Sequence, residues 1–218
     1  MLASEIKSQS DLYILDISLN LRSRLPITAM IHKMMNEQSS DISQELALLH
    51  TLSGALFSRH VEIIARRSEF RPIENESNVF STGSGRNQDY ANLLNAARKC
   101  VAHGYRVYIL PNPKSTRTAD FILERKGTFR MYDLKTISGR ASVRNRLLES
   151  IGQANQVILN MNTKYNPRLL AKDLMYYFHI NPSAIEVIIF KGNQLFLVKR
   201  MATEDKEFVK KFMQKFSR

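Results

Sequence analysis

A short apolar hairpin that runs directly into an Asp-x-Lys pattern constrains this chain more than any other stretch. Residues 119–135 read ADFILERKGTFRMYDLK. The apolar run at 121–123 predicts one strand, and the glycine-containing segment 125–128 predicts a tight turn. A second strand is then predicted from Phe129 onwards. The hairpin therefore predicts a local piece of sheet on which the rest of the fold is built.

The polar residues of this hairpin are predicted to meet at one end of the sheet. Because strand side chains repeat every two residues, Asp133 and Lys135 project from one face and Leu134 from the other. Asp120, at the start of the first strand, can lie across from them. Two carboxylates and a lysine in this arrangement are suited to a hard divalent cation beside a phosphate and an attacking water.

At these residues the sequence resembles the PD-(D/E)xK nuclease superfamily, whose mark is an Asp, a short hairpin, and then Asp or Glu two residues before Lys. Asp120 and the run Asp133-Leu134-Lys135 match that mark. A predicted amphipathic helix over 142–159 also looks like the helix after the Lys strand in nuclease domains of contact-dependent growth inhibition toxins and related polymorphic toxins. The resemblance covers about residues 87–199 and implies an α/β fold, a mixed sheet flanked by helices.

This resemblance implies the active site of a metal-dependent endonuclease. We assign Asp120 and Asp133 as ligands of Mg²⁺, with Mn²⁺ as an alternative, and the backbone carbonyl of Leu134 as a further oxygen. Lys135 is expected to orient or deprotonate the attacking water, or to stabilise the phosphate. Gln153 resembles the glutamine that accompanies the site in related nucleases, where it binds the water or a phosphate oxygen; alternatively it only bonds the neighbouring backbone.

The start of the helix predicted at 142–159 is a candidate nucleic-acid-binding region. Ser142, Arg144 and Arg146 lie where exposed backbone N–H groups and the helix dipole favour a phosphate. The alternatives are that Ser142 is only a helix cap and that the arginines are solvated.

The sequence departs from the family's pattern on the first helix. Many relatives carry a Glu there, whereas residues 92–95 read NLLN and contain no acid. The nearest carboxylate, Asp89, lies one turn earlier and is the candidate extra acid.

Charge is distributed very unevenly along the 218 residues. Residues 1–80 hold 8 Lys+Arg and 10 Asp+Glu, whereas residues 81–218 hold 24 and 10. The part that contains the hairpin thus carries a net charge of +14, as expected for a module that binds a polyanion such as nucleic acid.

Composition also bounds the compartment. The single cysteine, Cys100, excludes an intramolecular disulfide and is compatible with a reducing environment. No stretch approaches the roughly 20 apolar residues that span a bilayer, and the first residues lack a signal-peptide pattern. We therefore expect action in the cytoplasm; a toxin of this kind would arrive there as part of a larger protein.

The chain is predicted to divide at a polar segment rich in Ser, Asn and Gly. We expect a mainly helical domain at 1–72, a linker at 73–86 and the nuclease domain at 87–218. In the first part, residues 13–21 suit a strand as well as a helix, and helices are predicted over 26–35 and 40–64. In the second part, periodicity predicts a helix at 87–103, a strand at 106–110, a helix at 169–178, a hairpin of strands 185–190 and 195–199, and a basic helix at 204–216.

Three functions remain open at this level. The first is a toxin-type endonuclease with tRNA as its first-choice substrate, for which an acidic immunity protein covering the basic site is the expected partner. The second is a DNA endonuclease of restriction, repair or mobile-element type. The third is a non-catalytic nucleic-acid-binding module, which the absent first-helix acid favours.

Overall fold

The computed structural model describes residues 42–83, 89–111, 118–139 and 142–217, and a mixed sheet of eight strands runs through them. The strands lie side by side in chain order: β1 (Arg71–Ile73), β2 (Glu76–Ser81), β3 (Arg106–Ile109), β4 (Phe121–Arg125), β5 (Thr128–Ile137), β6 (Gln156–Met161), β7 (Glu186–Lys191) and β8 (Gln194–Lys199).

Helices occupy most of the remaining described chain. They are α2 (Ile42–Leu48), the 3₁₀ turn η1 (Leu49–Thr51), α3 (Gly54–Ala65), α4 (Tyr90–Ala102), α5 (Val143–Glu149), α6 (Pro167–Ile180), α7 (Arg200–Thr203) and α8 (Phe208–Phe216). Among the residues that the structure describes, no helix combines the length and the apolar character needed to cross a bilayer.

The sheet contains both parallel and antiparallel pairings. Strands β2 and β3, β5 and β6, and β6 and β7 pair in parallel, and the other neighbours are antiparallel. Each parallel pair needs a crossover, and α4, α5 and α6 lie in these three crossovers. The predicted α/β fold, a mixed sheet flanked by helices, is therefore confirmed.

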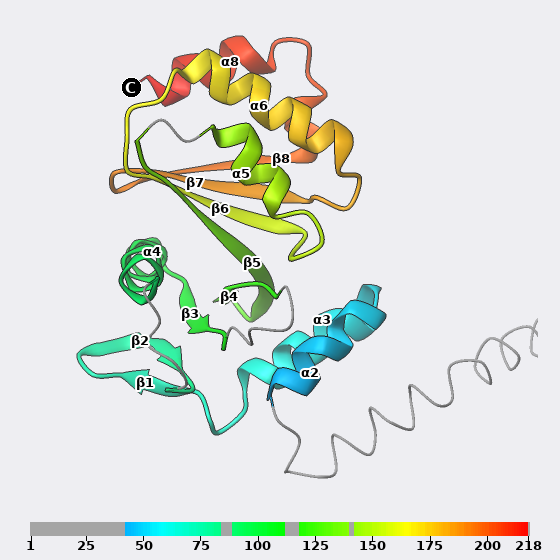
Figure 1. Ribbon diagram of the computed structural model, residues 1–218, viewed down its shortest axis with the longest axis vertical. Helices are drawn as coiled ribbons and strands as arrows, with labels where there is room; N and C mark the ends of the chain where they lie inside the picture. The colour runs from blue at the N-terminus through cyan, green and yellow to red at the C-terminus, as the bar shows by residue number, and fades with distance from the viewer. Residues whose placement is uncertain (1–41, 84–88, 112–117, 140–141, 218) are drawn as a thin grey trace, which may run out of the picture. The chain divides into compact units, whose positions relative to one another are not determined.

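Helices cover both faces of the sheet (Figure 1). On one face, α5, α6 and α8 share a hydrophobic core with β5–β8. On that same face, α2 and α3 pack over β3–β5. Helix α4 covers the opposite face, against residues such as Val107, Phe121 and Ile158. The face with α3 and α5 is thus covered by two separate groups of helices.

Strand β5 joins the two halves of the sheet. Its first five residues, 128–132, pair with β4, and its last five, 133–137, pair with β6. The predicted hairpin is confirmed, with Gly127 at a positive φ of 75° in its turn. The antiparallel partner of β5 ends where Asp133 begins the parallel pairing, so the Asp-x-Lys residues lie at the change of partner.

The prediction of a single helix over 142–159 is wrong. Helix α5 ends at Glu149, and residues 156–161 instead form β6, in which all six side chains are buried. A parallel strand buried on both faces is a continuous apolar run and carries no two-residue alternation, so periodicity reads it as helix. Gly152, at φ 83°, marks the actual break between the two elements.

The segment expected to be a linker is partly sheet. Residues Glu76–Ser81 form β2, which pairs in parallel with β3, although Ser77 and Asn78 are exposed and polar. The helix predicted over 40–64 is interrupted at Leu52 and Ser53 between η1 and α3. The segments predicted at 13–21 and 26–35 lie outside the described residues.

The other predicted elements are found with small shifts at their ends. Helix α4 lies within the predicted 87–103, α6 spans the predicted 169–178, and β7 and β8 form the predicted hairpin. The basic C-terminal helix begins later than expected, at Phe208, with residues 200–203 forming the separate α7.

A buried polar contact holds β5 in place just before the change of partner. The Tyr132 hydroxyl donates to Glu186 Oε1 over 2.5 Å, and Arg130 Nη1 donates to the same oxygen over 2.9 Å. Tyr132 and Glu186 are both 2% exposed. Burial, followed by Glu186, raises the pKa of Tyr132, so the phenol remains a donor at neutral pH. This contact ties β5 to β7.

Replacing Tyr132 by Phe is expected to lower the free energy of unfolding by about 1–3 kcal/mol, because a buried carboxylate loses a hydrogen bond. Urea unfolding measures the change. Tyr105→Phe is the matched control, since its hydroxyl only accepts a 3.5 Å contact from Arg125 at the surface. Equal losses in the two variants would contradict the role given to Tyr132.

Candidate active site

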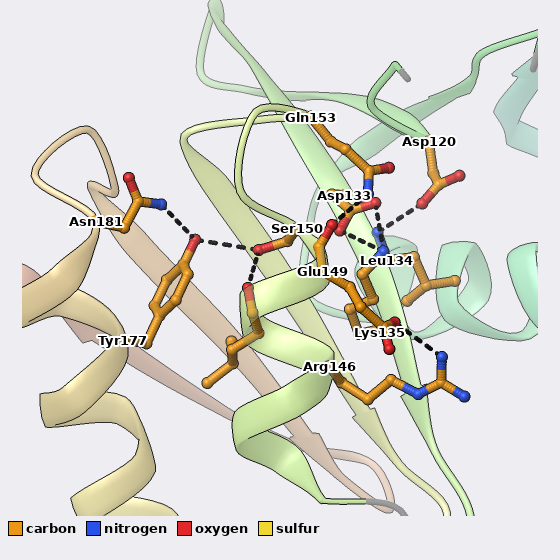
Figure 2. Close-up of polar contacts among 11 residues, drawn as sticks. Asp120, Asp133, Leu134, Lys135, Arg146, Glu149, Ser150, Gln153, Tyr177 and Asn181 are labelled. Carbon is orange, nitrogen blue, oxygen red and sulfur yellow. Dashed lines mark hydrogen bonds and ion pairs between the residues drawn. The ribbon is translucent and has the colours of Figure 1, made fainter. Parts of the chain in front are cut away.

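Asp120 takes the place of a missing strand partner where β5 leaves β4. Its backbone continues the ladder, donating to Tyr132 O over 3.0 Å and accepting from Leu110 N over 2.9 Å. Its carboxylate then accepts from Leu134 N over 2.7 Å (Figure 2). These three bonds fix the Asp120 carboxylate beside β5. The predicted approach of Asp120 to the Asp-x-Lys segment is therefore observed.

Asp133 and Lys135 project from the same face of β5, as the two-residue period predicts. Asp133 is 1% exposed, and Lys135 Nζ lies 3.2 Å from its Oδ1 and 2.9 Å from its Oδ2. Only the contact to Oδ1 has hydrogen-bond geometry. Within the described part of the chain, Oδ2 is a buried oxygen without a hydrogen-bond partner. Oδ2 is thus balanced by the Lys135 charge but accepts no hydrogen bond within this part of the structure.

The site disfavours the ionised forms of both carboxylates. Burial raises the pKa of Asp120. Burial, and after it the Asp120 carboxylate, raises the pKa of Asp133 to about 7, although Lys135 acts in the opposite direction. Two like charges in a poorly solvated site are stabilised together only by a shared proton or a cation. The lysine alone does not supply enough positive charge to restore an ordinary pKa.

The donor set fits a hard cation that keeps part of its water shell. Asp120 and Asp133 supply carboxylate oxygens. The carbonyl of Leu134 points towards the Asp120 side, because a strand residue directs its N–H and C=O to the same edge. Across the described ranges no group of three or more His, Cys, Asp or Glu side chains gathers as a metal cluster. Two carboxylates and a carbonyl suit Mg²⁺, which binds few protein ligands and retains water.

An open cleft of about 440 Å³ surrounds these residues. Its lining brings together most of the residues that the sequence predicted for the site: Asp89, Asp120, Asp133, Leu134, Lys135, Arg146 and Gln153. Asp89 precedes α4, and so the candidate extra acid does reach the cleft. Its charge contributes to the raised pKa of Asp120.

Gln153 lies in the turn after α5 and is held by the backbone. Its Nε2 donates to Glu149 O over 2.6 Å, and Figure 2 shows its amide beside the carboxylates. The backbone bond that the sequence left as an alternative is therefore present. It also fixes the amide at the edge of the cleft.

The three residues predicted to bind phosphate at the start of α5 separate in space. Arg146 lines the cleft and pairs with Glu149 over 2.9 Å, with its side chain 46% exposed. Arg144 instead pairs with the buried Asp173 over 3.0 Å and lies 4.6 Å from the Tyr176 ring centroid. Arg144 therefore joins α5 to α6 and is not among the cleft residues.

Ser142 also lies outside the cleft lining. It precedes α5 in an extended conformation, is exposed, and makes no side-chain capping bond. Its carbonyl accepts from Arg146 N over 3.2 Å, so its backbone starts the helix.

Sequence reasoning missed several polar residues of the cleft. Thr136, Ser138 and Asn162 line it, together with Asn92 of α4. Ser138 and Asn162 directly follow the parallel strands β5 and β6, and Asn162 N donates to Ile137 O over 2.9 Å. Polar residues after adjacent parallel strands meet at one sheet edge, which is the usable signal. The sequence does not reveal this signal, because β6 has no two-residue alternation and its pattern predicts a helix.

Comparison with known proteins does not assign the chain to a family. Neither a protein-family model nor a curated protein matches the chain. One similar solved structure is a CdiA-CT/CdiI toxin and immunity complex from Burkholderia pseudomallei, with 13% sequence identity and a TM-score of 0.35. The alignment covers 54% of this chain and 91% of that one.

The raised pKa of Asp133 predicts a pH-dependent stability in the absence of divalent metal. The unfolded chain releases this proton near pH 3.9, whereas the native protein keeps it to about pH 7. Wild-type stability therefore falls as pH rises through this interval. Asp133→Asn has no such proton. As pH rises from about 5 to about 8, the free energy of unfolding of Asp133→Asn relative to that of wild type should therefore rise by about 1 kcal/mol or more.

Urea unfolding in EDTA between about pH 5 and about pH 8 measures this difference. Asp205→Asn is the matched control, because Asp205 is exposed and Lys211 lowers its pKa, so that it stays ionised throughout the range. Parallel pH profiles for wild type and Asp133→Asn would show that Asp133 is ionised in the native protein.

Proposed function

We propose that the protein is a metal-dependent endonuclease that hydrolyses phosphodiester bonds in nucleic acid. The observation that carries the proposal is the meeting of the partly buried Asp120 carboxylate, the buried Asp133 carboxylate and Lys135 in an open cleft. The net charge of +14 over residues 81–218 supports a polyanionic substrate.

Asp120 and Asp133 would hold Mg²⁺ or Mn²⁺, with the Leu134 carbonyl as a further oxygen. When bound, such a cation supplies a Lewis acid for the phosphate and lowers the pKa of water. The protein's own contribution is to keep both carboxylates fixed, through the Leu134 N–H bond to Asp120 and the burial of Asp133. A rigid pair of oxygens reduces the reorganisation needed as the reaction proceeds.

Lys135 places a positive charge at the same point. Its ammonium group lies within 2.9–3.2 Å of both Asp133 oxygens. From there it can donate to a non-bridging phosphate oxygen or orient the attacking water, which stabilises the negative charge that develops on the phosphate. Gln153 and Arg146, which also line the cleft, offer further donors for water and phosphate.

The substrate and biological role rest on the sequence resemblance. It favours a toxin-type nuclease with tRNA as the first substrate to test and DNA as the second. For a toxin of this type, the expected partner is an acidic immunity protein that covers the site of this basic part of the chain.

Incubation of the protein with total tRNA and with plasmid DNA, in Mg²⁺ or in EDTA, tests the proposal. We expect cleavage that requires metal and falls about 100-fold or more in Asp133→Ala and in Lys135→Ala. Asp205→Ala and Lys210→Ala, at exposed positions of the C-terminal region, are the matched controls and should retain activity. Binding without cleavage in Mg²⁺ and in Mn²⁺ would instead favour the non-catalytic module.

Asp89 is expected to support the metal without being essential. It lines the cleft at a helix start, so Asp89→Asn removes one negative charge from the ligand environment. We expect the Mg²⁺ concentration for half-maximal cleavage to rise about 3- to 10-fold, with cleavage at saturating metal retained. Loss of activity at every metal concentration would make Asp89 a direct ligand. No change in the metal requirement would remove it from the site.

A further inference from the structure

A second and larger cleft lies on the same face of the molecule as the carboxylates. It measures about 880 Å³ and is formed by α3, the first residues of β5 and the loop 152–156. This size is within the range of pockets that enclose a small molecule or a nucleotide. Gln153 lines both this cleft and that of Asp120 and Asp133. The two spaces therefore adjoin each other at Gln153.

The lining of the larger cleft combines ring surfaces with buried polar groups. Phe57 and Phe129 contribute partly buried rings. Thr118 is 6% exposed, and its Oγ1 is buried without a hydrogen-bond partner among the residues described. Gln156 is 7% exposed and brings an amide that can both donate and accept. A flat ligand with a polar edge would satisfy both kinds of group.

Positive charge lies at the rim of this cleft. Arg130 is held by the buried Glu186 over 2.9 Å and keeps 45% of its side chain exposed. Arg59 is exposed on α3. The one acidic residue of the lining, Glu62, pairs with Arg66 over 2.8 Å. The cleft thus offers arginine side chains together with apolar ring surface. This combination suits a ligand that has both a negatively charged group and an aromatic ring.

We infer that this cleft is a base pocket, defined by Phe57, Thr118, Phe129, Gln153 and Gln156, for one unpaired nucleobase. The base would belong to a nucleotide next to the phosphate at Asp120 and Asp133, so the inference rests on the proposed nuclease function. Thr118 and Gln156 contact the edge of the base, and a phenylalanine ring stacks on its face.

The base pocket specifies the substrate class as single-stranded or looped nucleic acid. In a duplex each base is stacked and its pairing edge is covered, so it reaches such a pocket only after leaving the stack at a cost of a few kcal/mol. An unpaired base carries no such cost. The protein is therefore expected to select loops, bulges or single strands.

Equilibrium binding in EDTA tests the base pocket separately from cleavage. The probes are a fluorescent single-stranded oligonucleotide and its analogue with abasic nucleotides, made as RNA and as DNA. Wild type should bind the complete strand about fivefold or more tighter than the abasic strand. Thr118→Val and Gln156→Leu should each lower this ratio, because each removes one contact to the edge of the base while stacking on the phenylalanine ring remains, and each should leave affinity for the abasic strand unchanged. The circular dichroism spectrum verifies that each variant is folded.

Gln194→Leu is the matched control, because Gln194 is exposed at the start of β8. It should keep the wild-type ratio. Equal binding of the complete and abasic strands by wild type would overturn the base pocket, as would an unchanged ratio in both pocket variants. A preserved ratio without cleavage in Mg²⁺ would overturn the nuclease proposal and keep the pocket. Metal-dependent cleavage by a wild type that binds the complete and abasic strands equally would overturn the base pocket and keep the nuclease proposal.

Discussion

The site depends on one local event in the sheet, the change of partner along β5. After Tyr132 the strand has left β4, and from Asp133 it pairs with β6. At that point a backbone N–H would lose its partner, and the Asp120 carboxylate accepts from it instead, over 2.7 Å. This bond brings a second carboxylate next to Asp133. The same bond therefore completes the sheet and assembles the site.

The arrangement disfavours the ionised forms of these carboxylates. Burial raises the pKa of both Asp120 and Asp133, the Asp120 carboxylate raises that of Asp133 further, and one Asp133 oxygen has no hydrogen-bond partner in the described residues. Strain and unsatisfied groups of this kind gather at sites where a ligand completes the interactions. Lys135 alone leaves the pKa of Asp133 raised. A divalent cation would satisfy both carboxylates at once.

Local patterns in the sequence predicted the centre of the site, because every member of it lies within one hairpin. The turn and the two-residue period place Asp120, Asp133 and Lys135 together without reference to the rest of the chain. Longer-range features were less accessible: β6 has no alternation to reveal it, since both of its faces are buried. Arg144 forms an ion pair with Asp173 on α6, and no local sequence pattern predicts this contact. The base pocket joins α3 to the 152–156 loop, segments about 90 residues apart, and was not predicted.

Asp120 and Asp133 are proposed to bind one divalent cation together. Electron paramagnetic resonance of Mn²⁺ titrated into the protein measures free and bound metal without any substrate. We expect one bound Mn²⁺ per chain in wild type and in Asp205→Asn, displaced by Mg²⁺, and loss of that binding in both Asp120→Asn and Asp133→Asn. Undiminished binding in these two variants, or no binding in wild type, would contradict the proposal.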